Sequence, residues 1–298
     1  MRMLPATIAL TASLVGACSA SRAPSTPQDA ILNLHSQAAS SALELERSEE
    51  AIEQYRRAFE RAIARDDAGD IGDYGYDLAV AQLDANQPKQ ALASVGRTKT
   101  ELARRGAPSF AALDLAEATA YYRIGDKEAS DRLASKAEAG GDAAAAARAA
   151  YLRGLIADDD DNAEGLDQAV ARLANPTSTD QQADAAELIA RQQIRQGEFN
   201  GAATAAEHAA DLRRDILDYR GMARALSVAA YAEQRGGDAE AASSLYIRAG
   251  QSAAALGDSA SARSWLRRGM TLTKDSSLQE AAKISLASLK ASPAPADH

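Results

Sequence analysis

The chain has 298 residues, a formal net charge of −9 at pH 7 and one cysteine. A single thiol excludes a disulfide framework, so the fold must be held by its packed core. The acidic balance disfavours nucleic acid and anionic membrane surfaces as partners. Outside the N-terminal segment, which is too short to span as a permanent helix, no apolar run approaches the roughly 20 residues that a membrane-spanning helix requires.

The first residues carry the pattern of an export signal. Arg2 supplies a positive charge, residues 4–15 are mostly apolar, and the tetrapeptide VGAC at 15–18 places two small residues before the cysteine. This segment resembles a bacterial lipoprotein signal, in which the cysteine thiol takes a diacylglycerol group. The resemblance implies that residues 1–17 are a signal peptide and that the mature protein begins at a lipidated Cys18.

Two other interpretations of the cysteine stay open. Cys18 could be a buried free thiol, or an ordinary secretory signal could end after Ala17 or Ala20. By resemblance to enterobacterial lipoproteins, Ser19 in place of an aspartate implies sorting to the outer membrane, on its periplasmic side. The periplasmic face of the inner membrane is the alternative. The small residues and proline of 18–26 then form a lipidated tether.

Residues 27–290 indicate an all-α body, followed by a disordered tail at 291–298. Alanine dominates this body, aromatic and β-branched residues are sparse, and apolar residues recur at three- and four-residue spacing. Pro27 suits a first helical position. Glycine, proline, asparagine and aspartate punctuate the body at intervals, and these breaks predict about 13 or 14 helices.

The turns also recur at a regular interval. Aligned turn positions 46, 86, 125, 161, 197 and 237 lie 36 to 40 residues apart. Small residues stand seven positions before and five positions after four of these turns: Ala79 and Ala91, Ala118 and Ser130, Ala190 and Ala202, Ala230 and Ala242. Two helix axes approach closely only where side chains are small, so each unit predicts one helical hairpin. The same spacing of small residues recurs around Gly257, only half a period after Gly237. This predicts that the helix at about 239–256 belongs to two hairpins.

These features resemble the tetratricopeptide (TPR) repeat. The best matches are residues 49–58 and 242–249, where an aromatic residue follows an alanine by four positions and another alanine follows three later. Leu166 replaces a small residue in one unit, and the period exceeds the 34 residues of the family. The resemblance implies a right-handed α-solenoid of TPR-like helical hairpins.

A TPR-like superhelix binds partners in the groove lined by the first helix of each hairpin. The family's lining positions fall here mainly on tyrosines and arginines: Tyr76, Tyr122, Arg123, Arg148, Tyr151, Arg191, Arg195, Arg224, Tyr231 and Arg235. Both side chains bind strongly at interfaces, so we expect the groove to bind a protein segment bearing an acidic group. The alternative is that the arginines are merely solvated and that the tyrosines pack between neighbouring repeats.

The sequence holds little evidence of catalysis or metal binding. Its three histidines are scattered, and no nucleophile elbow, P-loop or nucleotide-binding glycine motif occurs. The acidic run at 158–165 resembles a calcium loop, but Ala171 stands where a bidentate glutamate is needed, which favours a helix-capping loop. We therefore expect no enzyme activity, no cofactor and no metal.

Together the two resemblances imply a lipid-anchored scaffold or adaptor that mediates protein–protein interactions in the assembly or maintenance of the bacterial envelope. Its expected partners are envelope proteins and, through the acyl chains, a membrane; nucleic acid and small-molecule substrates are not expected. The alternative is a superhelical subunit or regulator of a peptidoglycan-active enzyme. Glycan hydrolysis itself requires paired carboxylates in a cleft, which a sequence does not reveal.

Overall fold

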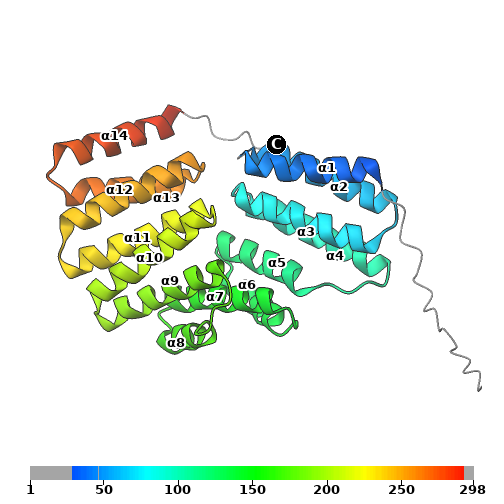
Figure 1. The fold of residues 1–298 in the computed structure, drawn as a ribbon, viewed down its shortest axis with the longest axis horizontal. Coiled ribbons are helices and arrows are strands. Elements are labelled where there is room, and N and C mark those ends of the chain that lie inside the picture. The colour runs from blue at the N-terminus through cyan, green and yellow to red at the C-terminus, as the bar shows by residue number, and fades with distance from the viewer. Residues whose placement is uncertain (1–28, 46, 292–298) are drawn as a thin grey trace, which may run out of the picture.

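The computed structural model describes residues 29–45 and 47–291 (Figure 1). The predicted signal peptide at 1–17 and the tether at 18–26, including Cys18, lie outside the described residues. The aligned turn position 46 also lies outside them. Residues 292–298 of the predicted tail also lie outside the described residues. Ala291, predicted as the first residue of the tail, is instead the last residue of the final helix.

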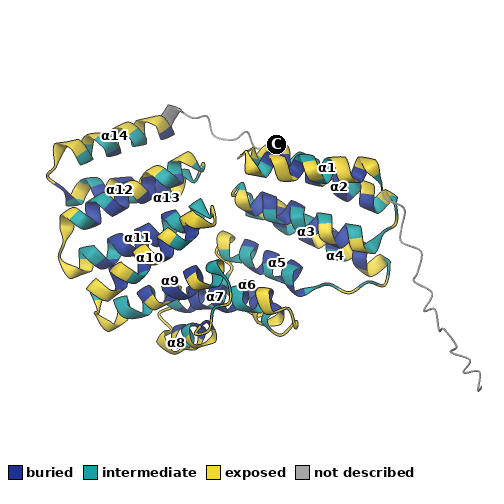
Figure 2. Ribbon diagram, in the orientation of Figure 1, coloured by how far each residue is buried: buried dark blue, intermediate teal, exposed yellow. Residues whose placement is uncertain are grey.

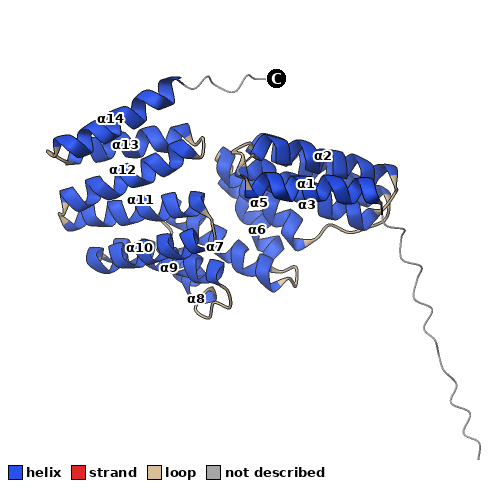
Figure 3. Ribbon diagram, turned by 45° about the horizontal axis from the view of Figure 1, so that its top comes forward, coloured by secondary structure: helices blue, strands red, loops and turns tan. Residues whose placement is uncertain are grey.

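Within the described ranges the chain forms fourteen α-helices and no strand (Figure 3), which confirms the all-α prediction. The helices are α1 (Ala30–Glu44), α2 (Ser48–Ala64), α3 (Ala68–Asp84), α4 (Pro88–Arg104), α5 (Ala111–Ile124), α6 (Lys127–Glu138), α7 (Ala143–Asp159), α8 (Ala163–Arg172), α9 (Thr179–Gln196), α10 (Phe199–Asp215), α11 (Tyr219–Gly236), α12 (Ala239–Ala255), α13 (Ser259–Leu272) and α14 (Ser276–Ala291).

The predicted turns are the places where the backbone becomes left-handed. The five described turn positions all have a positive φ: Asn86 at 59°, Gly125 at 89°, Asp161 at 56°, Gly197 at 80° and Gly237 at 98°. A left-handed residue ends one helix by satisfying its last carbonyl groups. A polar side chain then starts the next helix, as where Asp126 accepts a hydrogen bond of 3.0 Å from the Ala129 backbone N–H.

Small side chains hold each hairpin together, as the repeat predicts. All eight of the aligned alanines and serines are fully buried. Between α5 and α6 the Ser130 hydroxyl donates a hydrogen bond of 2.8 Å to the Ala118 carbonyl, which is possible only because both residues are small. In the next hairpin, a Cβ added to Gly154 would lie 2.5 Å from a methyl carbon of Leu188 and 2.9 Å from the Ala169 Cβ. The backbones therefore approach at these points.

The hairpins stack in chain order into an arc, and α1 and α14 form its two ends (Figure 1). Helices α3, α5, α7 and α9 each contact the next odd-numbered helix, so the series runs from α3 to α11. Because a curved stack brings the helices of its concave side closest together, these five, here termed the inner helices, line the concave side. From α11 onward the register changes: α12 packs against α11 and α13 and also contacts α14. α12 therefore relates to α14 as each inner helix relates to the next, which is the arrangement expected of a helix shared by two hairpins.

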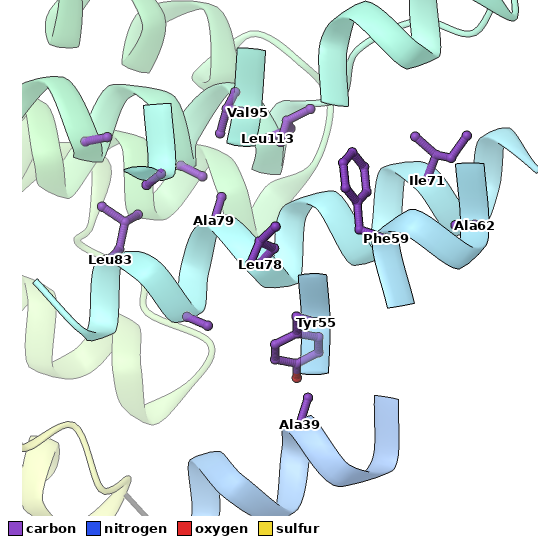
Figure 4. Close-up of a cluster of buried hydrophobic side chains, with 14 of the residues drawn as sticks. Ala39, Tyr55, Phe59, Ala62, Ile71, Leu78, Ala79, Leu83, Val95 and Leu113 are labelled. Atoms are coloured by element: carbon purple, nitrogen blue, oxygen red, sulfur yellow. The ribbon is translucent and has the colours of Figure 1, made fainter. Parts of the chain in front are cut away.

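The buried surface forms stripes on the helix faces that meet a neighbour (Figure 2). Much of this core is alanine, with larger side chains between helices, as in the N-terminal cluster of Tyr55, Phe59, Ile71, Leu78 and Leu113 (Figure 4). Among the described residues, no helix combines the length and the apolar character that crossing a bilayer demands.

Candidate functional site

All ten predicted groove residues lie on inner helices. Their distribution is as follows: Tyr76 on α3, Tyr122 and Arg123 on α5, Arg148 and Tyr151 on α7, Arg191 and Arg195 on α9, and Arg224, Tyr231 and Arg235 on α11. The structure does not bring them into one site. It divides them into residues that join neighbouring helices, a buried charge network and a pocket.

The two tyrosines of α3 and α5 pack between repeats. The Tyr76 ring meets the Phe110 ring edge-on, with centroids 6.2 Å apart. The Tyr122 hydroxyl donates a hydrogen bond of 2.8 Å to the Asp159 carboxylate at the end of α7. Burial, followed by the charge of Asp159, raises the pKa of Tyr122 above its ordinary value. Both tyrosines therefore take the structural role that the sequence had left open.

Arg123 satisfies the C-terminal end of α3. Its guanidinium donates a hydrogen bond to the Leu83 backbone carbonyl. A cation is favourable at this place because the last carbonyl groups of a helix carry a partial negative charge. Arg123 thus joins α5 to α3 across one repeat.

Arg148, Arg191 and Arg224 pair with carboxylates of α9. Arg148 Nη1 lies 2.6 and 2.8 Å from the two Asp184 oxygens. Arg224 Nε donates to Glu187 at 2.8 Å, and Arg191 Nη2 donates to the same carboxylate at 3.1 Å. Three predicted groove arginines are therefore already bound to acidic groups of the chain itself.

Arg213 on α10 completes this network, and the sequence analysis missed it. Its side chain is fully buried and donates to Asp184 at 2.8 Å, to Glu187 at 3.0 Å and to Asp218 at 2.7 Å. The groove-lining positions of the TPR family lie only on the first helix of each hairpin, and α10 is a second helix. These positions therefore do not include Arg213. A signal was present, because Arg213 continues the buried spacing of Ala203, Ala206 and Ala210. We call these residues with Arg148, Tyr151, Arg191 and Arg224 the arginine–carboxylate network.

Tyr151 lies at the centre of the arginine–carboxylate network. Only 3% of its surface is exposed. The guanidinium carbons of Arg148, Arg213 and Arg224 lie 5.2, 5.4 and 5.7 Å from its ring centroid, within the range of cation–π attraction. Its hydroxyl accepts a hydrogen bond of 2.7 Å from Arg224 Nη2. Burial raises the pKa of Tyr151 to about 12, so the phenol stays neutral.

Glu187 stays charged although its side chain is buried. Burial alone would raise the pKa of this carboxyl group. The guanidinium groups of Arg224, Arg213 and Arg191 outweigh that effect and hold the pKa of Glu187 below its ordinary value. A buried ionic network with matched partners supports one specific packing of α7, α9, α10 and α11.

The four aspartates of the 158–161 loop also bind neighbouring helices. Asp158 accepts hydrogen bonds from Arg191 at 2.8 Å and Arg195 at 2.7 Å, and Asp161 accepts another from Arg195 at 3.1 Å. Asp159 accepts from Tyr122, as described above, and Asp160 accepts from Lys127 at 2.6 Å. Within residues 29–45 and 47–291, no His, Cys, Asp and Glu side chains converge as metal ligands would.

The remaining predicted residues meet at a pocket. A hollow of about 580 Å³ opens between the C-terminal part of α7, α9 and α11. Its polar lining is Asp158, Asp161, Arg191, Arg195, Ser227, Tyr231 and Arg235, and its apolar lining is Ile194 and Val228. We call it the α9–α11 pocket. It is where the structure brings predicted groove residues together with space beside them.

Comparison with known proteins supports the fold. No protein-family profile and no curated protein sequence matches the chain. Among solved structures, the apo form of the quorum sensor NprR from B. thuringiensis aligns with a TM-score of 0.57 and 13% identity, covering 88% of this chain and 81% of that one. A tetratricopeptide repeat protein from Parabacteroides merdae aligns with a TM-score of 0.48 and 15% identity, covering 86% of this chain and 99% of its own.

At these identities the likeness concerns the fold alone. It agrees with what the helices show directly, namely hairpins that pack in sequence, each closed by small residues and ended by a left-handed turn. The fold is a TPR-like α-solenoid, as the sequential hairpins and the alignment with the quorum-sensor structure indicate.

Proposed function

We propose that this protein is a non-enzymatic scaffold that holds a protein partner against its inner helices. Stacked hairpins present a long continuous surface in place of a single catalytic cleft. The observation that carries the proposal is the α9–α11 pocket, because it leaves charged and apolar groups accessible on the layer where the other arginines are paired internally.

We propose further that Cys18 is lipidated and anchors the scaffold to the periplasmic side of the outer membrane, where its partner acts in envelope assembly or maintenance. The sequence pattern at residues 2–18 supports this location. Several acyl chains provide durable anchoring without a membrane-spanning helix. Mass spectrometry of the mature N-terminal peptide tests it: acyl mass on Cys18 is expected, and Cys18→Ser should move the protein into the soluble fraction.

Site-specific photo-crosslinking in intact cells tests the scaffold role. One crosslinker replaces Ser227, which lines the α9–α11 pocket, and a matched one replaces Thr204, an exposed residue of α10. We expect position 227 to capture one protein reproducibly and position 204 to capture none. Equal capture from both positions, or none from position 227, would contradict partner binding at the inner helices.

A further inference from the structure

Arg235, in the last turn of α11, differs from the other arginines of the α9–α11 pocket. Arg191 and Arg195 form ion pairs with Asp158 and Asp161. Arg235 is exposed and forms no ion pair with any residue that the structure describes. Its guanidinium is thus available to an anion from outside the chain.

Two aromatic rings hold this guanidinium in place. The Arg235 guanidinium carbon lies 5.2 Å from the Phe199 ring centroid and 5.7 Å from the Tyr231 ring centroid. Its Nη1 also donates a hydrogen bond of 2.9 Å to the Tyr231 hydroxyl. An arginine that is already ordered loses little conformational entropy on binding, and its remaining N–H groups match the two oxygens of a carboxylate.

The rest of the pocket limits what can bind there. Its lining holds three arginines against two aspartates, a local excess of one positive charge in a chain of net charge −9. The C-terminal carbonyl groups of α9 and α11 lie nearby and reduce long-range attraction for an anion. Affinity must therefore come from direct hydrogen bonds to Arg235 and from apolar contact with Ile194 and Val228.

We propose that the α9–α11 pocket binds an aspartate or glutamate side chain of the partner, with Arg235 as its ligand and with an adjacent aliphatic side chain against Ile194 and Val228. This inference rests on the proposed scaffold function and names the partner's chemistry. Arg123 is a weaker candidate for the same role because its guanidinium already binds the Leu83 carbonyl.

Peptide selection with the purified full-length chain tests the assignment. The probe is a bead library of random octapeptides, acetylated and amidated so that only side chains carry charge. Selected peptides are resynthesised in pairs that differ only in Glu or Gln, and their dissociation constants are measured by fluorescence anisotropy. Arg235→Gln is compared with Arg248→Gln, a matched control at an exposed arginine of α12.

We expect selected peptides to be enriched in acidic residues beside aliphatic ones, and Glu→Gln in the peptide to weaken binding about tenfold to a hundredfold. Arg235→Gln should abolish this Glu–Gln difference, whereas Arg248→Gln should preserve it. Ser227→Glu, which places a competing carboxylate in the pocket, should also weaken binding, and Ser227→Gln should not.

Two results overturn the assignment. One is selection of peptides without acidic enrichment, and the other is a Glu–Gln difference that survives Arg235→Gln. In either case, if selected peptides still bind the chain or the crosslinker at position 227 still captures a protein, the scaffold proposal stands and only the carboxylate site is refuted. If no peptide is selected and position 227 captures no protein, both proposals fail.

Discussion

Arg220 and Asp84 are 136 residues apart in the chain, yet Arg220 Nε donates a hydrogen bond of 2.9 Å to the Asp84 backbone carbonyl. The same guanidinium donates through Nη2 to the Leu256 carbonyl at 2.7 Å. Asp84 ends α3 and Leu256 follows the last residue of α12. One arginine of α11 therefore binds two helix C-terminal ends and ties the N-terminal part of the arc to its C-terminal part (Figure 1).

Removing this bridge should open the arc. In Arg220→Ala the carbonyl groups of Asp84 and Leu256 lose their shared donor, and we expect a larger radius of gyration by small-angle X-ray scattering with unchanged helicity by circular dichroism. The loss of unfolding free energy should be modest, about 1 to 3 kcal/mol for hydrogen bonds from a charged donor. Arg248→Ala serves as the control, and an identical radius in both variants would contradict the bridge.

Arg213 should be the arginine on which stability depends most. Arg213→Ala removes the one cation that bonds both Asp184 and Glu187, although Arg148, Arg191 and Arg224 still pair with these carboxylates. The loss of hydrogen bonds to buried charged groups should cost about 1 to 3 kcal/mol. The neighbouring Arg214 pairs only with exposed Asp211, so Arg214→Ala should change stability by less than about 0.5 kcal/mol. Urea unfolding followed by circular dichroism measures both. Equal losses from the two variants would show that the arginine–carboxylate network does not support the fold.

Asp77 on α3 should make stability depend on pH. Burial, and then the charge of Asp73, raise the pKa of Asp77 to about 6. An unfolded aspartate titrates near 4, so between about pH 4 and pH 6 the folded chain binds more protons, and this contribution to stability falls as the pH rises. Asp77→Asn should therefore stabilise the protein at pH 7.5, by about 1 to 2 kcal/mol for a half-buried group, and should have no effect at pH 4.

Chemical unfolding at the two pH values tests this dependence. Asp167→Asn, at an exposed position inside α8 and away from the helix ends, is the matched control and should give no gain at either pH. A gain from Asp77→Asn that is the same at pH 4 and pH 7.5 would exclude ionisation of Asp77 as its cause.

Two glycine substitutions should have opposite effects. At Gly154 in α7 a new Cβ would lie 2.5 Å from a Leu188 methyl carbon of α9 and 2.9 Å from the Ala169 Cβ of α8, so Gly154→Ala should overpack both contacts and cost about 1 to 3 kcal/mol. At Gly96 in α4 a new Cβ meets nothing within 4 Å, so Gly96→Ala should gain about 0.5 to 1 kcal/mol of helix propensity. Thermal or urea unfolding distinguishes them, and destabilisation by both would refute the packing role of Gly154.

Part of the arginine pairing could have been predicted from the repeat. Arg148 and Asp184 are 36 residues apart, and Glu187 and Arg224 are 37 apart, which is close to one period. Residues one period apart lie side by side on successive inner helices, so opposite charges at that spacing predict an ion pair. Taken one at a time, without the carboxylates one period away, the arginines leave open whether they bind a partner or the chain itself.

The sequence alone determined the helices, most of their ends and their pairing into hairpins. These features depend on backbone turns such as Gly125 and on small side chains such as Ala118, and both act within one repeat. The prediction that the first helix begins at Pro27 was wrong, because Asp29 is the N-cap and α1 begins at Ala30. Only the tertiary structure decided which arginines are free. The burial of Arg213 and the contact of Arg220 with Asp84 depend on how far the stacked hairpins curve, and that curvature accumulates over many interfaces that no single sequence segment specifies.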